Sequence, residues 1–177
     1  MQTLYIFDAD GTLVQSFTGN ELLPRRAEML RRIIDNGDLI AIATNQGGAA
    51  CEAAGWSSER RKYPSVTDVR RRFREIAQNI CDVTGLKSVE IAIAYAFFNK
   101  RTNEWMQANF KPCKEFYESS TPEWRKPSTG MLDYLAALHP YLKAVYVGDR
   151  GSDREAAENA GIEYYDAYEF FSGVIII

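Results

Sequence analysis

Short apolar runs alternate along the chain with segments whose apolar residues recur at helical spacing. The first run, residues 4–7, is unbroken and contains Tyr, Ile and Phe, which is typical of a strand buried on both faces. Four later runs have similar character, over 38–43, 89–97, 144–147 and 162–165. Helices are expected between them, over 24–36, 65–85, 128–139 and 153–160. This alternation predicts an α/β fold: a doubly wound, Rossmann-like, mainly parallel sheet with helices on both faces.

Local signals mark where some of these elements begin. Ser65 with Asp68 resembles a capping box at the start of one helix, and Ser152 with Glu155 predicts another for the last helix. In the helix over 128–139, four apolar residues are expected to face the core: Met131, Leu132, Leu135 and Leu138.

Two stretches lack a clear period. Residues 45–64 are rich in Gly, Ala and Ser and are predicted to form a loop. Residues 98–125 are an aromatic-rich insert, longer than an ordinary loop. The aromatic side chains either form a satellite cluster that folds back on the core or help the insert to shape the entrance to a site.

Length and composition suit one globular domain over residues 1–177. Of the 177 residues, 46% are hydrophobic and 25% are charged. No apolar stretch approaches the roughly 20 residues that a membrane helix needs, and the start of the chain lacks a signal-peptide pattern. Three cysteines without a close pair suit a reducing compartment, so a cytoplasmic protein is expected. Nothing in the composition points to a particular oligomeric state.

Positive charge is concentrated in one part of the chain, although the net charge is −3. Seven basic residues lie close together: Arg60, Arg61, Lys62, Arg70, Arg71, Arg72 and Arg74. Such a run is usually a solvated helix face, but it attracts anions if it borders a catalytic edge. Both interpretations stay open at this point.

Two acidic residues, Asp8 and Asp10, follow the first predicted strand, and Gly11 ends it. Ligands bind at the carboxyl edge of an open α/β sheet, where this strand would place both carboxylates. The two groups repel each other unless a cation or a shared proton holds them together. A solvated acidic turn is the plain alternative. A calcium loop fits less well, because the glycine comes too early and the closing glutamate is missing.

Three further segments complete a recognisable set of motifs. They are 42–48 (Ile-Ala-Thr-Asn-Gln-Gly-Gly), 124–131 (Trp-Arg-Lys-Pro-Ser-Thr-Gly-Met) and 147–153 (Val-Gly-Asp-Arg-Gly-Ser-Asp). Together with 8–13 (Asp-Ala-Asp-Gly-Thr-Leu), they resemble, in order and context, the four motifs of the haloacid dehalogenase (HAD) superfamily of phosphatases. One motif alone is weak, but the ordered set spans nearly the whole chain.

This resemblance implies a Mg²⁺-dependent phosphatase with a HAD-like sheet. Asp8 would attack phosphorus and form an aspartyl-phosphate. Asp10 would protonate the leaving group and later take a proton from water. Mg²⁺ would be held by Asp8, by Asp149 and by the backbone carbonyl of Asp10, since this ion prefers an all-oxygen shell.

The other motif residues would bind the phosphoryl group or support the site. The resemblance gives Thr44, the Asn45 backbone N–H and Lys126 contacts to the phosphoryl oxygens. It gives Arg125 a further substrate contact and Thr12 a supporting position in the first motif. Asp153 would orient Lys126 or a metal-bound water. Taken singly, Lys126 could be a surface lysine, Thr44 a strand end and Asp153 a helix-terminal charge.

The second and third motifs resemble the capless subfamily III. It includes histidinol-phosphate phosphatases, heptose bisphosphate phosphatases and polynucleotide 3′-phosphatases. Residues 12–22 stand where other members carry a large cap, so an open entrance is expected. The first two groups usually carry a zinc loop of Cys and His before the motif lysine. Here 98–125 contains Cys113 and no His, and His139 is the one histidine of the chain, which argues against both groups.

The resemblance leaves the substrate open between two phosphate classes. A 3′-phosphate at a DNA or RNA end is favoured by the Arg-Lys-Pro-x-x-Gly-Met form and by 169–171 (Glu-Phe-Phe), which resembles the end of such a phosphatase domain. The acidic net charge and the absence of a kinase P-loop count against it. The alternative is a small phosphorylated sugar, amino alcohol or nucleotide. A non-catalytic scaffold is a remote third interpretation, because all the motif acids and Lys126 are present.

Overall fold

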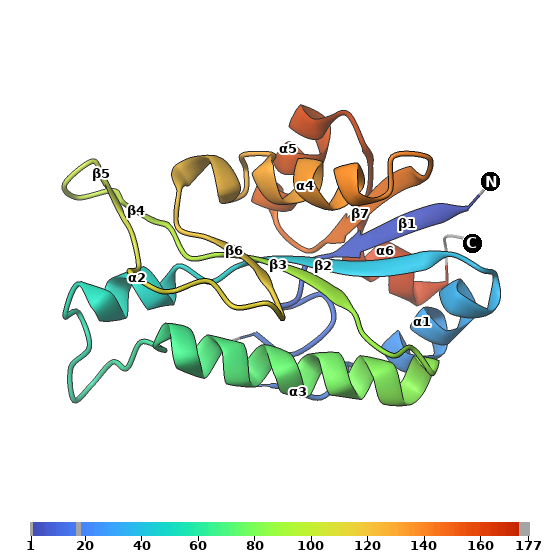
Figure 1. Ribbon diagram of the computed structural model, residues 1–177, viewed down its shortest axis with the longest axis horizontal. Helices are drawn as coiled ribbons and strands as arrows, with labels where there is room; N and C mark the ends of the chain where they lie inside the picture. The colour runs from blue at the N-terminus through green and yellow to red at the C-terminus, as the bar shows by residue number, and fades with distance from the viewer. Residues whose placement is uncertain (1, 17–18, 174–177) are drawn as a thin grey trace.

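A six-stranded sheet forms the centre of the computed structural model, which describes residues 2–16 and 19–173 (Figure 1). The strand order is β6-β3-β2-β1-β7-β8, and every neighbouring pair is parallel. The strands are β1 (Thr3–Phe7), β2 (Leu39–Asn45), β3 (Glu90–Ala94), β6 (Tyr117–Ser119), β7 (Lys143–Gly148) and β8 (Glu163–Asp166). The predicted doubly wound parallel fold is therefore confirmed.

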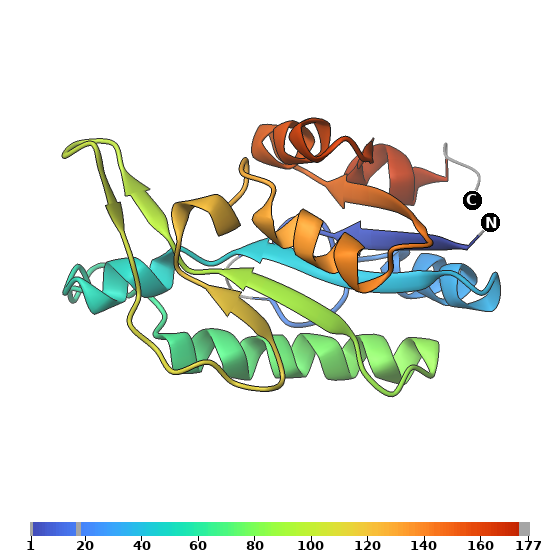
Figure 2. The same cartoon turned by 45° about the horizontal axis from the view of Figure 1, so that its top comes forward.

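Helices cover both faces of this sheet (Figure 2). On one face lie α1 (Arg26–Asp35), α3 (Val66–Thr84) and α6 (Ala167–Ser172), and on the other lie α4 (Gly130–Leu138) and α5 (Gly151–Ala160). Successive strand residues point to opposite faces, so Phe7 packs with the first group and Ile6 with the second. The face under α4 is lined by Ala41, Ala43, Ala92 and Ala94, whereas Ile40, Ile42, Ile91 and Ile93 fill the opposite face.

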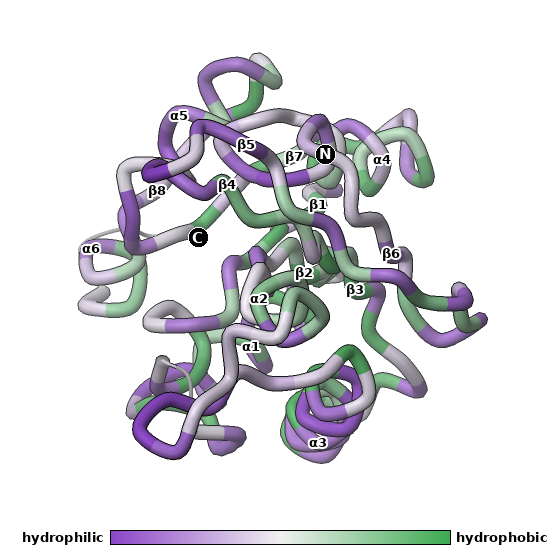
Figure 3. Tube along the Cα trace, turned by 90° about the vertical axis from the view of Figure 1, so that its left-hand side faces the viewer, coloured by the Kyte–Doolittle hydropathy of each residue, from purple (hydrophilic) through white to green (hydrophobic). Residues whose placement is uncertain are grey.

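The aromatic-rich insert supplies both a hairpin and an edge strand of the main sheet. β4 (Phe97–Asn99) and β5 (Glu104–Met106) pair antiparallel and project past the carboxyl edge of the sheet near α2 (Gly48–Ala53) (Figure 1). This edge faces the viewer in Figure 3. The chain then returns as β6 beside β3. A 3-10 helix, Pro122–Trp124, leads directly to Lys126.

Some element boundaries differ from the prediction. Helix α2 lies inside the predicted loop 45–64, and β6 and α6 were not predicted. The third predicted strand, 89–97, ends at Ala94, because Phe97 pairs with Met106 in the hairpin instead. Leu138 is 39% exposed rather than buried, since it lies in the last turn of α4.

The two predicted capping boxes have opposite outcomes. At α3 the Ser65 hydroxyl accepts a hydrogen bond from the Asp68 backbone N–H, and Asp68 accepts one from the Ser65 backbone, so this box is confirmed. The Ser152–Glu155 box is wrong, because α5 already begins at Gly151. There the Asp153 carboxylate accepts the Arg150 backbone N–H at 3.0 Å. Within the described residues, no helix has both the length and the apolar character needed to cross a membrane.

Candidate active site

The motif residues meet at the carboxyl edge of the sheet. Asp8 follows β1, Thr44 and Asn45 end β2, and Asp149 follows β7. Since these three strands are parallel neighbours, their ends bring the side chains to one place. The loop before α4 adds Lys126 from outside the sheet.

Lys126 is almost fully buried at the middle of this group. Its Nζ lies 2.7 Å from Oδ1 of Asp8 and 2.7 Å from Oδ1 of Asp153. Nζ also donates to the Ala43 carbonyl at 2.9 Å. Burial lowers the pKa of Lys126, but the two carboxylates together outweigh burial and hold the pKa above its ordinary value. The lysine is therefore a fixed positive charge beside Asp8.

A tyrosine that the sequence analysis did not single out belongs to the same group. The Tyr146 hydroxyl lies 2.5 Å from Lys126 Nζ and 3.2 Å from Oδ1 of Asp153. Its ring is fully buried on the alanine-lined face of the sheet. The sequence did contain a signal for this residue, because Tyr146 lies in an otherwise apolar strand directly before a motif. A buried tyrosine hydroxyl requires a hydrogen-bond partner, and the motif supplies polar groups close by along the chain.

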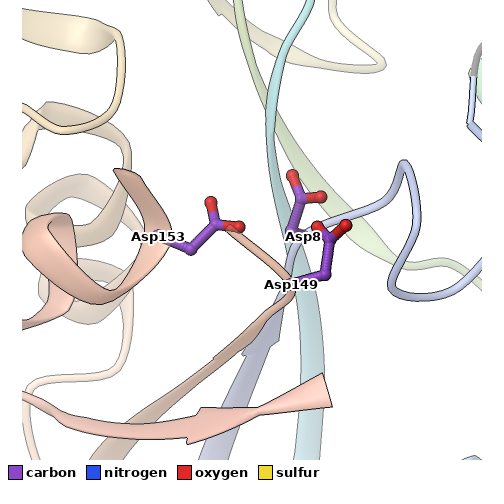
Figure 4. A group of neighbouring side chains, drawn as sticks. All are labelled: Asp8, Asp149 and Asp153. Atoms are coloured by element: carbon purple, nitrogen blue, oxygen red, sulfur yellow. The ribbon is translucent and has the colours of Figure 1, made fainter. Parts of the chain in front are cut away.

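Three carboxylates, from Asp8, Asp149 and Asp153, converge at this edge (Figure 4). Their ligand oxygens all lie within 4.8 Å of one another. Burial raises the pKa of Asp8 to about 7; Asp153 and Asp10 also raise it and Lys126 opposes them. Burial and then Asp153 likewise raise the pKa of Asp149. A cation would relieve this repulsion, and a set of carboxylate oxygens suits the hard ion Mg²⁺.

Close approach of the first and fourth motifs requires a glycine at position 11. Gly11 has φ +89°, and a Cβ added there would lie 2.3 Å from Oδ2 of Asp149. The Thr12 hydroxyl lies 3.5 Å from Oδ1 of the same carboxylate. The first motif therefore packs closely around the Asp149 carboxylate, and this packing leaves no room for a side chain at position 11.

Asp10 is held by partners from two directions. Gln46 Nε2 donates to Oδ2 of Asp10 at 2.7 Å and to the Thr44 hydroxyl at 3.0 Å. Arg72 of α3 donates from Nη2 to Oδ1 at 2.6 Å. Gln46 lies within the second motif, whereas nothing in the local sequence distinguished Arg72 from its basic neighbours.

Asn45 and Arg125 contact the protein chain itself. The Asn45 side chain accepts from the Lys126 backbone N–H at 3.1 Å and donates to the Lys126 carbonyl at 2.9 Å. This pair of bonds fixes the loop that carries the lysine. Arg125 Nη1 donates to the Ala96 carbonyl at 2.9 Å, and burial lowers the pKa of this guanidinium. The proposed phosphate contact of Arg125 stays a prediction.

The arginines of α3 are matched by carboxylates. Besides the Arg72–Asp10 pair, Arg70 binds Glu118 at 2.7 Å and Arg74 binds Glu115 at 2.6 Å, while Arg71 pairs with Asp68. Arg60, Arg61 and Lys62 are exposed in the loop between α2 and α3. The basic run therefore reaches the site through Arg72, and its remaining helical part forms ion pairs within the protein.

Comparison with known proteins gives a family and a shared fold. The family model described as polynucleotide kinase 3 phosphatase matches residues 3–171. A D-glycero-D-manno-heptose-1,7-bisphosphate 7-phosphatase from Thermosynechococcus vestitus is 28% identical over 162 residues, covering 87% of this chain and 72% of that protein.

Solved structures agree with this match. D,D-heptose 1,7-bisphosphate phosphatase from B. bronchiseptica, complexed with magnesium and phosphate, has a TM-score of 0.62 at 18% identity, covering 92% of this chain and 79% of its own. A HAD-like phosphatase from Mesorhizobium loti has a TM-score of 0.60 at 18% identity, covering 91% and 69%. At such identities the similarity shows the fold. With the family match over residues 3–171, the chain belongs to the polynucleotide kinase 3 phosphatase family and is a phosphatase of the haloacid dehalogenase superfamily.

Proposed function

We propose that the protein hydrolyses phosphomonoesters with Mg²⁺ through an aspartyl-phosphate formed on Asp8. The observation that carries this proposal is the buried contact of Lys126 with Asp8 and Asp153 beside the carboxylate of Asp149. A carboxylate nucleophile and a fixed ammonium at one sheet edge are what attack on a phosphate dianion requires.

Asp8, Asp149 and the backbone carbonyl of Asp10 would hold the Mg²⁺ ion, with Asp153 next to them. The bound ion supplies positive charge that lets an anionic substrate approach the carboxylates. Their converging oxygens support this assignment, as does the raised pKa of Asp8, because both indicate carboxylates that lack sufficient positive charge. Lys126 supplies part of that charge from the protein.

The chemical steps then use groups of this chain. An Asp8 oxygen attacks phosphorus, the bond from phosphorus to the leaving oxygen breaks, and Asp10 transfers a proton to that oxygen. Water then attacks phosphorus of the phosphoaspartate, and Asp10 takes a proton from the water. The bond from phosphorus to the Asp8 oxygen breaks, which frees the Asp8 carboxylate and releases inorganic phosphate. The Thr44 hydroxyl accepts from Gln46, so its own proton can be donated to a phosphoryl oxygen.

The substrate class we favour is a 3′-phosphate at a nucleic-acid end. The family match supports it, and so does an open cavity of about 600 Å³ beside the carboxyl edge. Trp56, just after α2, and Trp105 of β5 line this cavity and are 38% and 42% exposed. Arg101, in the turn between β4 and β5, also lines the cavity and brings a positive charge, and Glu104 of β5 lines it as well. Exposed aromatic rings with a nearby cation suit unstacked bases and backbone phosphates.

A small sugar phosphate is the second candidate. It is supported by the heptose-bisphosphate phosphatase that is 28% identical over most of this chain. The ion pairs of α3 also favour it, because they neutralise much of the positive charge that a nucleic-acid strand would need. Both candidates share the reaction at Asp8.

The test measures phosphate release, with and without Mg²⁺, from an oligonucleotide bearing a 3′-phosphate and from a panel of sugar, amino-alcohol and nucleotide monophosphates. Asp8→Asn is the blank. We expect Mg²⁺-dependent turnover that Asp8→Asn abolishes. If no substrate is turned over in Mg²⁺, the scaffold interpretation replaces the catalytic one.

A pair of aromatic variants separates the two substrate classes. For an oligonucleotide substrate, Trp105→Ala should raise KM about 10-fold, because base stacking contributes ~1–3 kcal/mol per base. The same variant should leave p-nitrophenyl phosphate hydrolysis unchanged. Tyr141→Ala is the matched control, since Tyr141 is 93% exposed and lies before β7, at the opposite edge of the sheet. Turnover confined to the small-molecule panel would overturn the nucleic-acid assignment.

A further inference from the structure

Arg72 is the one arginine of α3 whose described ion pair reaches the candidate active site. Its Nη2 lies 2.6 Å from Oδ1 of Asp10, and its Nη1 lies 3.3 Å from Oδ2. The guanidinium thus faces both oxygens of one carboxylate, which is the two-pronged geometry that fixes a carboxylate in orientation as well as in place. The two side chains are only 15% and 11% exposed.

The same guanidinium also holds the flap segment, residues 12–22, of which 17 and 18 lie outside the described residues. Arg72 Nη2 donates to the Gly19 carbonyl at 3.0 Å, and Nε donates to the same oxygen at 3.3 Å. A longer contact, 3.4 Å, runs to the Gln15 carbonyl. One side chain of α3 therefore connects Asp10 with two backbone carbonyls of the segment that follows it.

The neighbouring arginines show that this placement is particular to position 72. Arg71 pairs with Asp68 on its own helix, and Arg74 pairs with Glu115, where both side chains are about half exposed. Arg72 precedes Phe73, which is fully buried and fixes the rotation of α3 against the sheet. The packing of the helix thus directs the Arg72 side chain toward the carboxyl edge.

We propose that Arg72 is a positioning residue for Asp10, which it aims at the leaving oxygen of the substrate while anchoring the flap segment. This inference rests on the acid–base role of Asp10 in the proposed function. Gln46 holds Asp10 from the other side through Oδ2, so the carboxylate is clamped between α3 and the second motif. Arg72 itself makes no described contact with Asp8 or Asp149 and acts through Asp10.

The test compares substrates whose leaving groups differ in their need for a proton. Loss of a merely structural residue would lower kcat/KM for both substrates alike. p-Nitrophenolate departs without needing a proton, whereas an alkoxide requires one from the acid. The parameter kcat/KM reports the steps up to leaving-group departure, so it isolates the acid role of Asp10 from its later role as a base. We would measure it for p-nitrophenyl phosphate and for an alkyl phosphate with Arg72→Ala, Arg72→Lys and Asp10→Asn.

Arg72→Ala should lower kcat/KM for the alkyl phosphate about 100-fold and for p-nitrophenyl phosphate less than about 5-fold, since general acid catalysis contributes ~10²–10⁴-fold. Arg72→Lys should recover part of the loss, because the charge remains while the two-pronged contact is lost. Arg74→Ala is the matched control and should leave kcat/KM unchanged for both substrates. If Arg72→Ala does not fold, Arg72→Gln, which keeps side-chain length and an N–H donor, replaces it.

The comparison with Asp10→Asn separates two kinds of failure. If Asp10→Asn is selective for the alkyl phosphate but Arg72→Ala reduces both substrates equally, the positioning role is overturned while the acid assignment stands. If Asp10→Asn itself shows no selectivity, the acid assignment fails, and the role of Arg72 fails with it. Selective loss in both variants, with partial recovery in Arg72→Lys, supports the inference.

Discussion

The ammonium of Lys126 and the carboxylate of Asp153 lie 2.7 Å apart, and each side chain is only 1% exposed. Asp153 is also bound by the Tyr146 hydroxyl and by the Arg150 backbone N–H. The lysine is therefore held between two acids in the protein interior, where its removal leaves both carboxylates without the charge that compensates them.

Lys126→Met should abolish activity and destabilise the protein. Phosphatase activity should fall about 10³-fold, since one electrostatic contact to the reacting group contributes this much. The free energy of unfolding should fall by about 3 kcal/mol, because a buried ion pair loses one partner. Urea unfolding measures the second effect. Lys143→Met breaks the exposed pair with Glu163 and should change the free energy of unfolding by less than ~1 kcal/mol. Equal losses in the two variants would contradict the buried pairing.

Stability without metal should fall as the pH rises. The folded protein raises the pKa of Asp8 to about 7, so it keeps a proton that the unfolded chain has already released. The stabilisation from this group is complete below the unfolded pKa and is lost as the pH rises through 7. Between pH 5 and 7 the free energy of unfolding should fall by up to ~1.4 kcal/mol per pH unit relative to Asp8→Asn.

Chemical unfolding in EDTA, at several values from pH 5 to pH 8, measures this difference. Asp8→Asn carries no titrating group at position 8 and is the reference at every pH. Mg²⁺ should stabilise the wild-type protein most above pH 7, where Asp8 is ionised. Parallel curves for the two proteins would exclude a raised pKa at Asp8.

Gly11→Ala should weaken Mg²⁺ binding. The added Cβ would lie 2.3 Å from Oδ2 of Asp149 and must displace this carboxylate, in addition to the strain of φ +89°. Gly37→Ala is a close control, because it has a similar φ, +84°, with nothing within 4 Å of the added Cβ. Both variants should lose about 1 kcal/mol of stability from backbone strain. When activity is titrated with Mg²⁺, the concentration that gives half-maximal activity should rise at least about 10-fold for Gly11→Ala and stay unchanged for Gly37→Ala.

Glu118→Gln should loosen the insert from the main sheet. The Glu118 side chain is fully buried and binds Arg70 and the Tyr95 hydroxyl, the latter at 2.6 Å. We expect a loss of about 3 kcal/mol in unfolding free energy, since Arg70 keeps its charge without its partner. Glu115→Gln removes the exposed partner of Arg74 and should cost less than ~1 kcal/mol. Thermal unfolding of the two variants distinguishes them, and similar midpoints would show that Glu118 has no special role.

The candidate site could be located from the sequence because strand ends determine where its main residues lie. Asp8, Thr44 and Asp149 each follow an apolar run, and parallel strands bring such positions to one edge. The apolar spacing of α3 likewise predicts the face that Val69, Phe73 and Ile76 bury. Local patterns of this kind specify which residues face the core.

Contacts between elements could not be obtained in the same way. The Arg72–Asp10 pair depends on how far α3 lies from β1, which no spacing within α3 encodes. Strand β6 is only three residues long, which is too short to show a hydrophobic period of its own. It is held by its pairing with β3 and by the contacts of its own residue Glu118. The start of α5 was misplaced because Asp153 serves both as a cap and as a partner of Lys126.

The two faces of the sheet differ in how well they should tolerate substitution of their core residues. Ala43 and its alanine neighbours leave the room that the Tyr146 ring and the Lys126 stem occupy, and the Ala43 carbonyl binds both polar tips. A larger residue there would displace groups of the active site. The isoleucine face packs mainly against α1, α3 and α6, together with Ala9 and Leu13 of the first motif. Engineering for thermostability should therefore redesign the packing beneath α1, keep the Phe73 packing of α3 that directs Arg72, and keep every alanine beneath α4.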